Sequence, residues 1–394
     1  MATALRLDAH EAPPIGIRHE YKKYQKLEPR GFDEDLDIID FQRGLTRSQD
    51  ADVVQIGAVS AGRLAAACQS FHQAGKQHMP TAAGSNIPSR DIPIYQHGKL
   101  PGLHMLPSLL PPNTQLALLS RLLHRDLSNP KHKTNIHAHH QVVYCQAAPP
   151  SPASEAQDEP PRRNITSFFN RPPSSSEVFP PKDSTTHKPL RVSQFLQSKL
   201  RWMTLGGQYD WTMKEYPPEP PPPFPVDIAN LLHSLFPDMK AQAAIVNLYS
   251  PGDTLSVHRD VSEECDRGLV SISLGCDCIF IVGLEEEKGG QLDSGETGRR
   301  PRSEAGSNSL LGEGTDERVD MLAIRLRSGD AVYMSGRSRF AWHGVPKIIP
   351  ATCPGWMQEW PAQPQAEDGA GGVEAWRGWM ASKRVNVNVR QMWE

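Results

Sequence analysis

The chain has 394 residues, a formal net charge of −3 and a pI of about 6.6. Because 42 Lys and Arg stand against 45 Asp and Glu, no overall positive field captures nucleic acid, and any polyanion site must be local. No apolar run reaches the ~18 residues of a membrane span, and the first residues do not resemble a secretion signal. The 6 scattered cysteines are typical of reduced thiols. We therefore expect a nuclear or cytoplasmic protein, with the mitochondrion also open, that is not secreted.

The N-terminal part gives few functional signals. Residues 1–95 mix charges with short apolar patches, so we expect an N-terminal extension that is partly flexible. Within it, the apolar spacing over residues 53–68 predicts a helix. Residues 96–146 are expected to form a helical part, because apolar residues recur at helical spacing after a pair of prolines. That spacing predicts one helix over 113–127.

Residues 147–190 have the composition of a disordered linker. The segment is rich in Pro, Ser and charged residues, and such a sequence buries too little apolar surface to offset the entropy of ordering it. The composition of the whole chain also indicates that part of it does not pack, since hydrophobic residues make up only 38% and there are 36 prolines. We predict that this Pro/Ser-rich linker does not pack.

From residue 225 the sequence is typical of a β-protein. Short runs of Val, Ile, Leu and Tyr alternate with Gly, Asp and Ser turns. The predicted strands cover 244–249, 255–259, 270–274, 278–283, 321–326, 331–335, 343–349 and 384–390. Such a succession predicts a double-sheet jelly roll over residues 225–394. Polar stretches at about 285–317 and 361–375 are predicted to be surface insertions, which cost little to close.

A candidate metal site begins in the strand 255–259. Side chains alternate between the faces of a strand, so His258 and Asp260 point one way and Arg259 the other. Imidazole and carboxylate suit a divalent ion, and a second imidazole, for which His343 is the candidate, would complete the triad of non-haem Fe(II) oxygenases. The short pattern alone is weak, because a polar surface strand is the more common explanation of it.

The segment 384–390, Arg-Val-Asn-Val-Asn-Val-Arg, alternates strictly between apolar and polar residues. Its valines form a face that must pack, and Arg384, Asn386, Asn388 and Arg390 form the other. A polar face in water is one interpretation. However, Asn is depleted in strands, and two guanidinium groups on a rigid strand suit a ligand with a carboxylate at each end. 2-Oxoglutarate is such a ligand, and its keto-acid end can chelate Fe(II).

These segments together resemble the AlkB family of Fe(II)/2-oxoglutarate-dependent dioxygenases, most of all the AlkB homologue 1 branch. The matching residues are Asn247-Leu248-Tyr249, Pro251-Gly252, Leu255, His258-Arg259-Asp260, His343 and the final RVNVNVR. The likeness covers residues 200–394 well. It implies an α+β protein with a double-stranded β-helix (jelly-roll) core, an N-terminal helical extension and a nucleotide-recognition lid over residues 191–224.

The resemblance also implies roles for individual residues. In this family pattern, iron is held by His258, Asp260 and His343. The distal carboxylate of 2-oxoglutarate is held by Arg384, Asn386 and Tyr249, and its keto-acid end by Arg390 and Asn247. The residues expected to face the substrate are Tyr209, Trp211, Tyr216 and Ser262. The aromatic residues fall where the family stacks an extruded base, although they are equally interpreted as packing residues. Ser262 stands where the bacterial pattern has an acidic residue, and Asn388 where it has Thr.

The implied activity uses Fe(II), 2-oxoglutarate and O₂ as cosubstrate to demethylate or hydroxylate methylated bases in tRNA, DNA or both. We expect a monomer that acts on nucleic acid and does not contact membranes. Two alternatives stay open. One is a nucleic-acid-binding adaptor whose pocket is vestigial, and the other is an oxygenase that acts on protein.

Overall fold

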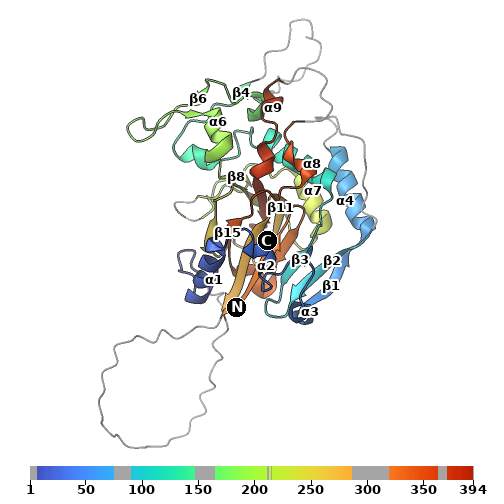
Figure 1. Cartoon of the computed structure of the whole chain (residues 1–394). Coiled ribbons are helices and arrows are strands. Elements are labelled where there is room, and N and C mark those ends of the chain that lie inside the picture. The colour runs from blue at the N-terminus through green and yellow to red at the C-terminus, as the bar shows by residue number, and fades with distance from the viewer. Residues whose placement is uncertain are drawn as a thin grey trace, which may run out of the picture.

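The computed structural model describes residues 7–74, 90–146, 165–210, 213, 215–285, 319–362 and 371–393. Two antiparallel β-sheets dominate this part of the chain, and helices cover their outer faces (Figure 1). In the same residues, no helix is both long and apolar enough to cross a bilayer.

The larger sheet has eight strands in the order β1-β2-β3-β14-β11-β16-β9-β8, and every neighbouring pair is antiparallel. Its strands are β1 (Val53–Val59), β2 (Ile92–His97), β3 (Leu103–Leu106), β8 (Trp202–Gly206), β9 (Ala243–Tyr249), β11 (Leu269–Gly275), β14 (Ala331–Met334) and β16 (Arg384–Arg390). We call it the major sheet.

The smaller sheet has four strands in the order β10-β15-β12-β13, and we call it the minor sheet. Its strands are β10 (Leu255–His258), β12 (Cys278–Glu285), β13 (Val319–Leu326) and β15 (Trp342–Ile348). All the strands predicted between residues 244 and 390 are present, each within two residues of its predicted ends. Four belong to each sheet, which fits the predicted jelly roll.

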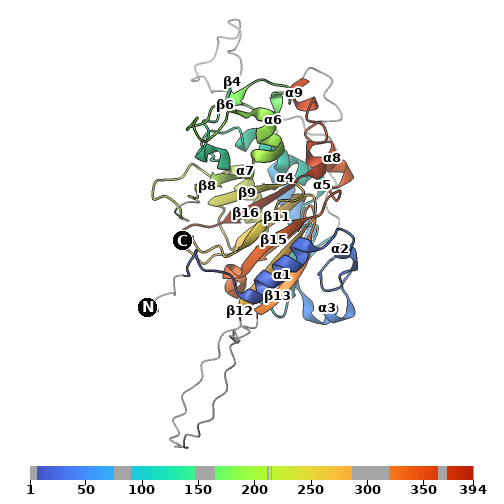
Figure 2. The ribbon, with the colours of Figure 1, turned by 60° about the vertical axis from the view of Figure 1, so that its left-hand side comes forward.

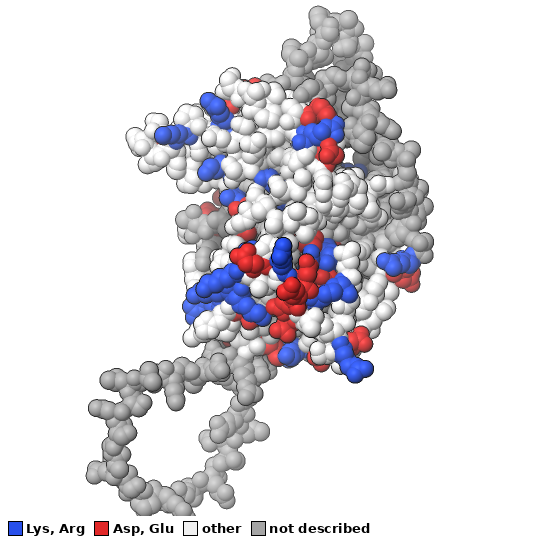
Figure 3. Space-filling model, viewed as in Figure 1, with Lys and Arg blue, Asp and Glu red and all other residues white. Residues whose placement is uncertain are grey.

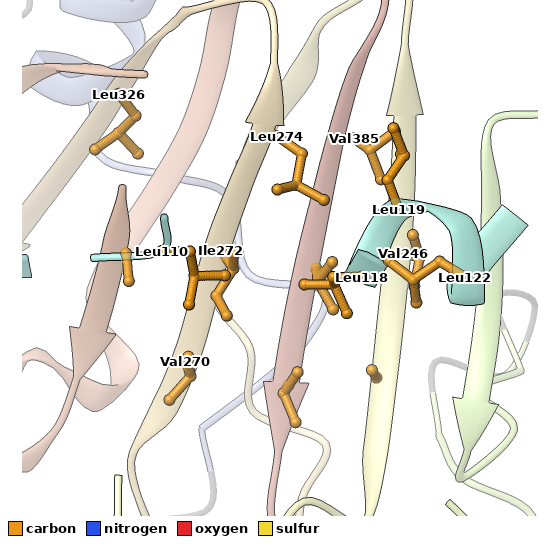
Figure 4. Packing of buried hydrophobic residues seen from close by; sticks show 14 of the residues in the cluster. Leu110, Leu118, Leu119, Leu122, Val246, Val270, Ile272, Leu274, Leu326 and Val385 are labelled. Atoms are coloured by element: carbon orange, nitrogen blue, oxygen red, sulfur yellow. The ribbon is translucent and has the colours of Figure 1, made fainter. Parts of the chain in front are cut away.

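The valine face of β16 packs as its alternation requires. Val387 pairs with Val246 of β9 and with Ile272 of β11, so one face of three neighbouring strands is aliphatic. Figure 4 shows leucines of the helical segment 112–126, among them Leu118 and Leu122, packed against this face. Because residues alternate, the polar side chains of the same strands point into the interior between the two sheets.

The helix predicted over 113–127 is present as α5 (Pro112–Ser120), which continues as the π-helix η1 (Arg121–Asp126). The helix predicted over 53–68 is wrong in its first half. Val53–Val59 form the edge strand β1, and only Ala61–Ala74 are helical, as α4. Residues 53–59 form a strand because they pair with β2, and this tertiary contact overrides their weak helical periodicity.

The predicted disordered linker is also wrong where the structure describes it. Residues 165–190 form the short strands β5 (Ile165–Thr166), β6 (Val178–Phe179) and β7 (Leu190–Arg191) and the 3-10 turn η4 (Phe168–Asn170). Three phenylalanines supply the apolar surface that the composition argument overlooked, because they are buried: Phe168, Phe169 and Phe179. Residues 147–164 lie outside the described part, as do most of the two predicted insertions, 286–318 and 363–370.

The described part of the predicted N-terminal extension packs against the two sheets. Helix α1 (Ile15–Lys26) lies across the outer face of the minor sheet (Figure 2), where Ile17 and Tyr24 are fully buried. Beyond it, Arg325 of β13 binds Asp33 and Asp277, which fastens the chain after α1 to the sheet edge. The remaining helical elements are α2 (Gly31–Glu34), α3 (Arg47–Asp52), η2 (Asn135–Ala138), α6 (Val192–Gln194), η5 (Phe195–Lys199), α7 (Val226–Leu235), η6 (Gly336–Phe340), α8 (Gly355–Gln358), α9 (Gly371–Glu374) and η7 (Trp379–Ser382).

Candidate metal and cosubstrate site

Three side chains predicted as metal ligands lie together between the sheets. His258, the last residue of β10, stands directly opposite His343 of β15, with ring centroids 4.4 Å apart. Asp260 follows β10 by two residues and turns back toward both rings. One potential ligand atom from each of the three residues lies within 4.8 Å of the others.

Backbone carbonyls fix the orientation of both imidazoles. The Nδ1 atom of His258 lies 2.9 Å from the Ser256 carbonyl oxygen, and the Nδ1 atom of His343 lies 3.0 Å from that of Ala341. When Nδ1 donates to a carbonyl, Nε2 keeps its lone pair, which is the arrangement of most metal-binding histidines. Both Nε2 atoms face Asp260, at 3.7 and 3.9 Å from its carboxylate oxygens.

The local electrostatics favour a charged carboxylate beside a neutral imidazole. Burial alone would raise the pKa of Asp260, but Arg390 and the two imidazoles hold that pKa below its usual range. For His343, burial and then the neighbouring His258 lower the pKa to about 4. At neutral pH these two groups therefore have the protonation states in which they can bind a divalent metal.

Unpaired buried atoms show that the site fits a metal ion. Among the described residues, the buried His343 Nε2 has no hydrogen-bond partner, and the buried Asp260 Oδ2 forms no hydrogen bond, although it lies 3.2 Å from the Arg390 guanidinium. A buried polar atom without a partner costs free energy, so such atoms call for an explanation. Two imidazole nitrogens and one carboxylate form the donor set of non-haem Fe(II) sites, and that ion would satisfy these atoms.

A second set of unpaired atoms lies on the polar face of β16. Arg384 is 1% exposed, and its two Nη atoms donate to the Cys276 carbonyl at 3.1 Å and to the Ser273 hydroxyl at 2.7 Å. Its Nε has no partner among the described residues, nor has the hydroxyl of Tyr249 on the neighbouring strand. Burial raises the pKa of Tyr249, so this hydroxyl remains a proton donor. The Arg384 Nε and the Tyr249 hydroxyl together can donate to one carboxylate group.

Arg390, at the other end of β16, is already paired with carboxylates. Its Nη2 lies 3.2 Å from Asp260 Oδ2, and its Nη1 donates to Glu263 at 2.9 Å. Glu263 is buried and also accepts a bond from Arg339, at 2.9 Å. Only the Nε of Arg390 is left without a partner among the described residues. Glu263 and Arg339 were not identified as site residues from the sequence. The only sequence feature that could have indicated Glu263 is its position next to Ser262.

The asparagines of this face differ in their contacts. Asn386 lies between Asn247 of β9 and Ser273 of β11 in the strand register, and its Nδ2 donates to the Ser271 hydroxyl at 2.8 Å. The Oδ1 atom of Asn388 has no partner in the described part of the chain. Asn247, Asn386 and Asn388 are all buried. The alternative interpretation required the polar face of β16 to point into water, and it does not.

Arg259 points away from the site, as the strand alternation predicts. Its guanidinium lies over the indole of Trp342, 4.3 Å from the ring centroid, and forms an ion pair with Glu11. The indole nitrogen of Trp342 in turn donates to Glu285 at 2.7 Å. Arg259 therefore links the N-terminal segment to the outer side of the strand that carries His258.

The predicted substrate residues are partly placed. Tyr209 and Tyr216 meet edge to face with centroids 5.2 Å apart, and Tyr209 shares a side-chain hydrogen bond with Ser262. The charges of Arg390, Glu263 and Asp260 all act on the Tyr216 hydroxyl, so this aromatic pair borders the site. Trp211 lies outside the described residues.

Comparison with known proteins agrees with this geometry. Residues 160–390 match the family model described as the 2OG-Fe(II) oxygenase superfamily, so the chain belongs to that superfamily. The family implies Fe(II) and 2-oxoglutarate as cofactor and cosubstrate. Within it, the chain is an AlkB-family oxygenase close to the ALKBH1 branch.

Three fungal relatives support this placement. The N6-methyladenosine RNA demethylase ALKB1 of Pyricularia oryzae is 44% identical over 98% of both chains. The N6-methyladenosine RNA demethylase ALKBH of Cryphonectria parasitica is 48% identical over 65% of this chain and 99% of that protein. The tRNA demethylase abh1 of Schizosaccharomyces pombe is 36% identical over 76% of this chain and 82% of that protein.

Proposed function

We propose that this protein is an Fe(II)- and 2-oxoglutarate-dependent dioxygenase that removes N-methyl groups from bases in nucleic acid, with RNA the first substrate to test and DNA the second. The observation that carries the proposal is the convergence of two imidazoles and one carboxylate within 4.8 Å beside a buried guanidinium. The relatives named as RNA and tRNA demethylases supply the substrate class. We expect the protein to act as a monomer in the nucleus or cytoplasm.

The polar groups near the metal site receive roles in this proposal. His258, Asp260 and His343 would hold Fe(II) through two imidazole nitrogens and one carboxylate oxygen. Arg384 and Tyr249 bind the distal carboxylate of 2-oxoglutarate through their unpaired Nε and hydroxyl groups. The residues assigned to the remaining contacts with the cosubstrate are Asn247, Asn386 and Arg390.

Iron with 2-oxoglutarate and O₂ supplies the oxidation of an N-methyl group, and the hydroxymethyl product breaks down to formaldehyde and the unmethylated base. The protein supplies position and charge. Arg390 holds the Asp260 carboxylate ionised and in place, and the carbonyls of Ser256 and Ala341 hold the imidazole orientations. Burial of the polar face excludes water from the interior in which the methyl group reacts.

Tyr209 and Tyr216 contact the substrate in this proposal. Their rings border the site, and aromatic side chains at such a mouth stack on an extruded base, which is worth about 1–3 kcal/mol per base. Ser262 is assigned to the same surface, and Trp211 is proposed to contact the substrate as well. An adaptor with a vestigial pocket would have no use for buried unpaired ligand atoms, so we favour the enzyme.

Mass spectrometry of nucleosides tests the proposal. Native tRNA, poly(A) RNA, DNA and methylated histone peptides are incubated with iron-loaded protein, ascorbate and 2-oxoglutarate, and each methylated species is measured before and after. We expect a methylated base to decline in nucleic acid only when 2-oxoglutarate is present. Decline of peptide methylation alone would support the protein oxygenase, and no decline in any pool would refute the demethylase.

A further inference from the structure

The segment between η1 and β8 contains more basic than acidic residues. We call residues 127–146 and 165–201 the basic lobe. It contains eight Lys and Arg against two Asp and Glu, a formal charge of +6 in a chain whose total is −3. In Figure 3, blue side chains predominate on the upper part of the molecule that carries β6 and α6, whereas both signs are interleaved around α1 and α2 below.

The basic lobe borders the last strand of the major sheet. Strand β8 is the last strand of that sheet, and Thr134 forms an antiparallel bridge to its Met203. The Lys133 carbonyl accepts from the Thr204 amide at 2.9 Å, and Asn135 Oδ1 accepts from the Arg201 amide at 2.9 Å. The segment around residues 131–135 therefore runs alongside β8 in a defined register.

This register places basic side chains along the edge of β8. Lys131 and Lys133 lie toward its C-terminal end and Lys199 just before its N-terminal end, and all three are exposed. None of the three has an ion-pair partner among the described residues, so their charges are available to a ligand. Arg201, by contrast, is paired with Asp253.

The C-terminal end of β8 leads to the proposed active site. Gln208 accepts a bond from the Lys133 amide at 2.9 Å, and the next residue is Tyr209, which meets Tyr216 at the border of the metal site. A strand rises about 3.3 Å per residue, so β8 from Trp202 to Gly206 spans roughly 13 Å. Exposed lysines thus follow one path from the lobe surface to the aromatic pair.

We propose that this edge binds the phosphodiester backbone next to the target nucleotide, with Lys131 and Lys133 contacting the phosphates nearest the extruded base and Lys199 one farther along. The inference rests on the proposed function, because it assumes a nucleic acid substrate. An acidic protein could also bind exposed lysines, but its binding would not require them to lie beside the strand that leads to the aromatic pair. A nucleic acid strand whose target base enters the site does require this, so it is the partner that fits.

Charge reversal at two lysines tests the inference. The variant Lys131→Glu with Lys133→Glu is compared with Lys22→Glu and Lys26→Glu, which changes the total charge equally on α1. The probe is a 20-nucleotide RNA with one N6-methyladenosine, and its affinity is measured from 50 to 300 mM NaCl. Because each phosphate contact adds about 0.7 to the salt slope for a single strand, we expect the slope to fall by about 1.4 and affinity roughly tenfold at 100 mM salt.

The control variant should bind like the wild type. Equal weakening in both variants would mean that only net charge matters, and an unchanged slope in the Lys131 and Lys133 variant would mean that this edge does not contact phosphate; either result overturns the inference. The neutral variant Lys131→Gln with Lys133→Gln guards against misfolding and should show a smaller loss in the same direction.

Conversion of 2-oxoglutarate to succinate without RNA separates this inference from the proposed function. The lysine variants should convert 2-oxoglutarate at the wild-type rate, since neither lysine touches the metal site. If the wild type itself converts none, the proposed function fails, whereas unchanged RNA binding by the lysine variants with normal conversion refutes only the inference.

Discussion

The two arginines of β16 use their charges differently. Arg390 has two carboxylate partners, Asp260 and Glu263. Arg384 has no ion-pair partner among the described residues, and it meets neutral oxygens only. A fully buried guanidinium without a counterion is costly, so Arg384 is the group that gains most from an anionic ligand.

Arg384→Lys should weaken binding of 2-oxoglutarate. The variant keeps the positive charge but loses the planar fork that a carboxylate matches, so we expect KM for 2-oxoglutarate to rise at least about tenfold. Arg327→Lys, at the residue that follows β13 and whose guanidinium pairs with Asp40, provides the control and should leave KM unchanged. Equal KM values for wild type and Arg384→Lys would show that this guanidinium does not hold the cosubstrate.

Glu263→Ala should destabilise the folded protein strongly. Glu263 is the shared counterion of Arg339 and Arg390, and its removal leaves two buried guanidinium groups with incomplete partners. Loss of one partner from a buried ion pair costs about 3–5 kcal/mol in the free energy of unfolding. Urea unfolding measures this loss, with the exposed Glu264→Ala as the neighbouring control. A change under about 1 kcal/mol would show that the network contributes little.

The start of β16 lies very close to the neighbouring strand of the sheet, β11. Gly275, the last residue of β11, has φ +85° and stands opposite Arg384, and a Cβ there would lie 2.3 Å from the Lys383 carbonyl oxygen. Only glycine fits both the conformation and the contact. The position of Arg384 is therefore set partly by its glycine neighbour.

Gly275→Ala should reduce stability and cosubstrate binding together, because β16 must shift to relieve the contact. Gly252→Ala is the matched control: its φ is +93°, but nothing lies within 4 Å of the added Cβ. We expect the control to lose only the conformational cost of positive φ, about 1 kcal/mol, and Gly275→Ala clearly more. Equal losses of melting temperature would show that the contact at Gly275 is unimportant.

Strands of the C-terminal region could be predicted because one face of each had to be apolar. Strict alternation in β16 gave its ends correctly, and turn residues bounded the others. β1 could not be predicted, because all its interior residues are exposed and only its ends are buried. Its strand form depends on pairing with β2, which lies beyond a long stretch of sequence.

The same limit applies to the site. The spacing of His258 and Asp260 and the polar face of β16 are local patterns, so they pointed to the metal and to a diacid. The contacts of Glu263 with Arg339 and Arg390 join residues 76 and 127 positions apart. No local pattern encodes such a pairing.

At the scale of the whole molecule, buried histidines make stability depend on pH. Burial lowers the pKa of His124 to about 4, below the ~6.5 of an unfolded chain. Well above pH 6.5 the imidazole is neutral in both states and contributes nothing to the pH dependence. As pH falls from 6.5 to 4, the unfolded chain takes up protons that the folded protein does not, so stability falls.

His124→Phe should reduce this acid-induced loss. The ring contacts Trp360 and Phe169, at 5.0 and 5.4 Å between centroids, so phenylalanine keeps the packing and removes the titration. Urea unfolding at pH 7.5 and pH 5 gives the loss for each protein. The variant should lose less stability between these two pH values than the wild type, and an equal loss in both would exclude His124 as a contributor.

The central claim is that two histidines, one aspartate and a buried arginine serve oxidative demethylation. The most direct measurement quantifies succinate, formaldehyde and N6-methyladenosine in one reaction with methylated RNA, for the wild type and for Asp260→Ala. We predict that the wild type releases formaldehyde in step with loss of the methyl group, and that Asp260→Ala releases none while still binding the RNA. Demethylation by Asp260→Ala at the wild-type rate would contradict the account.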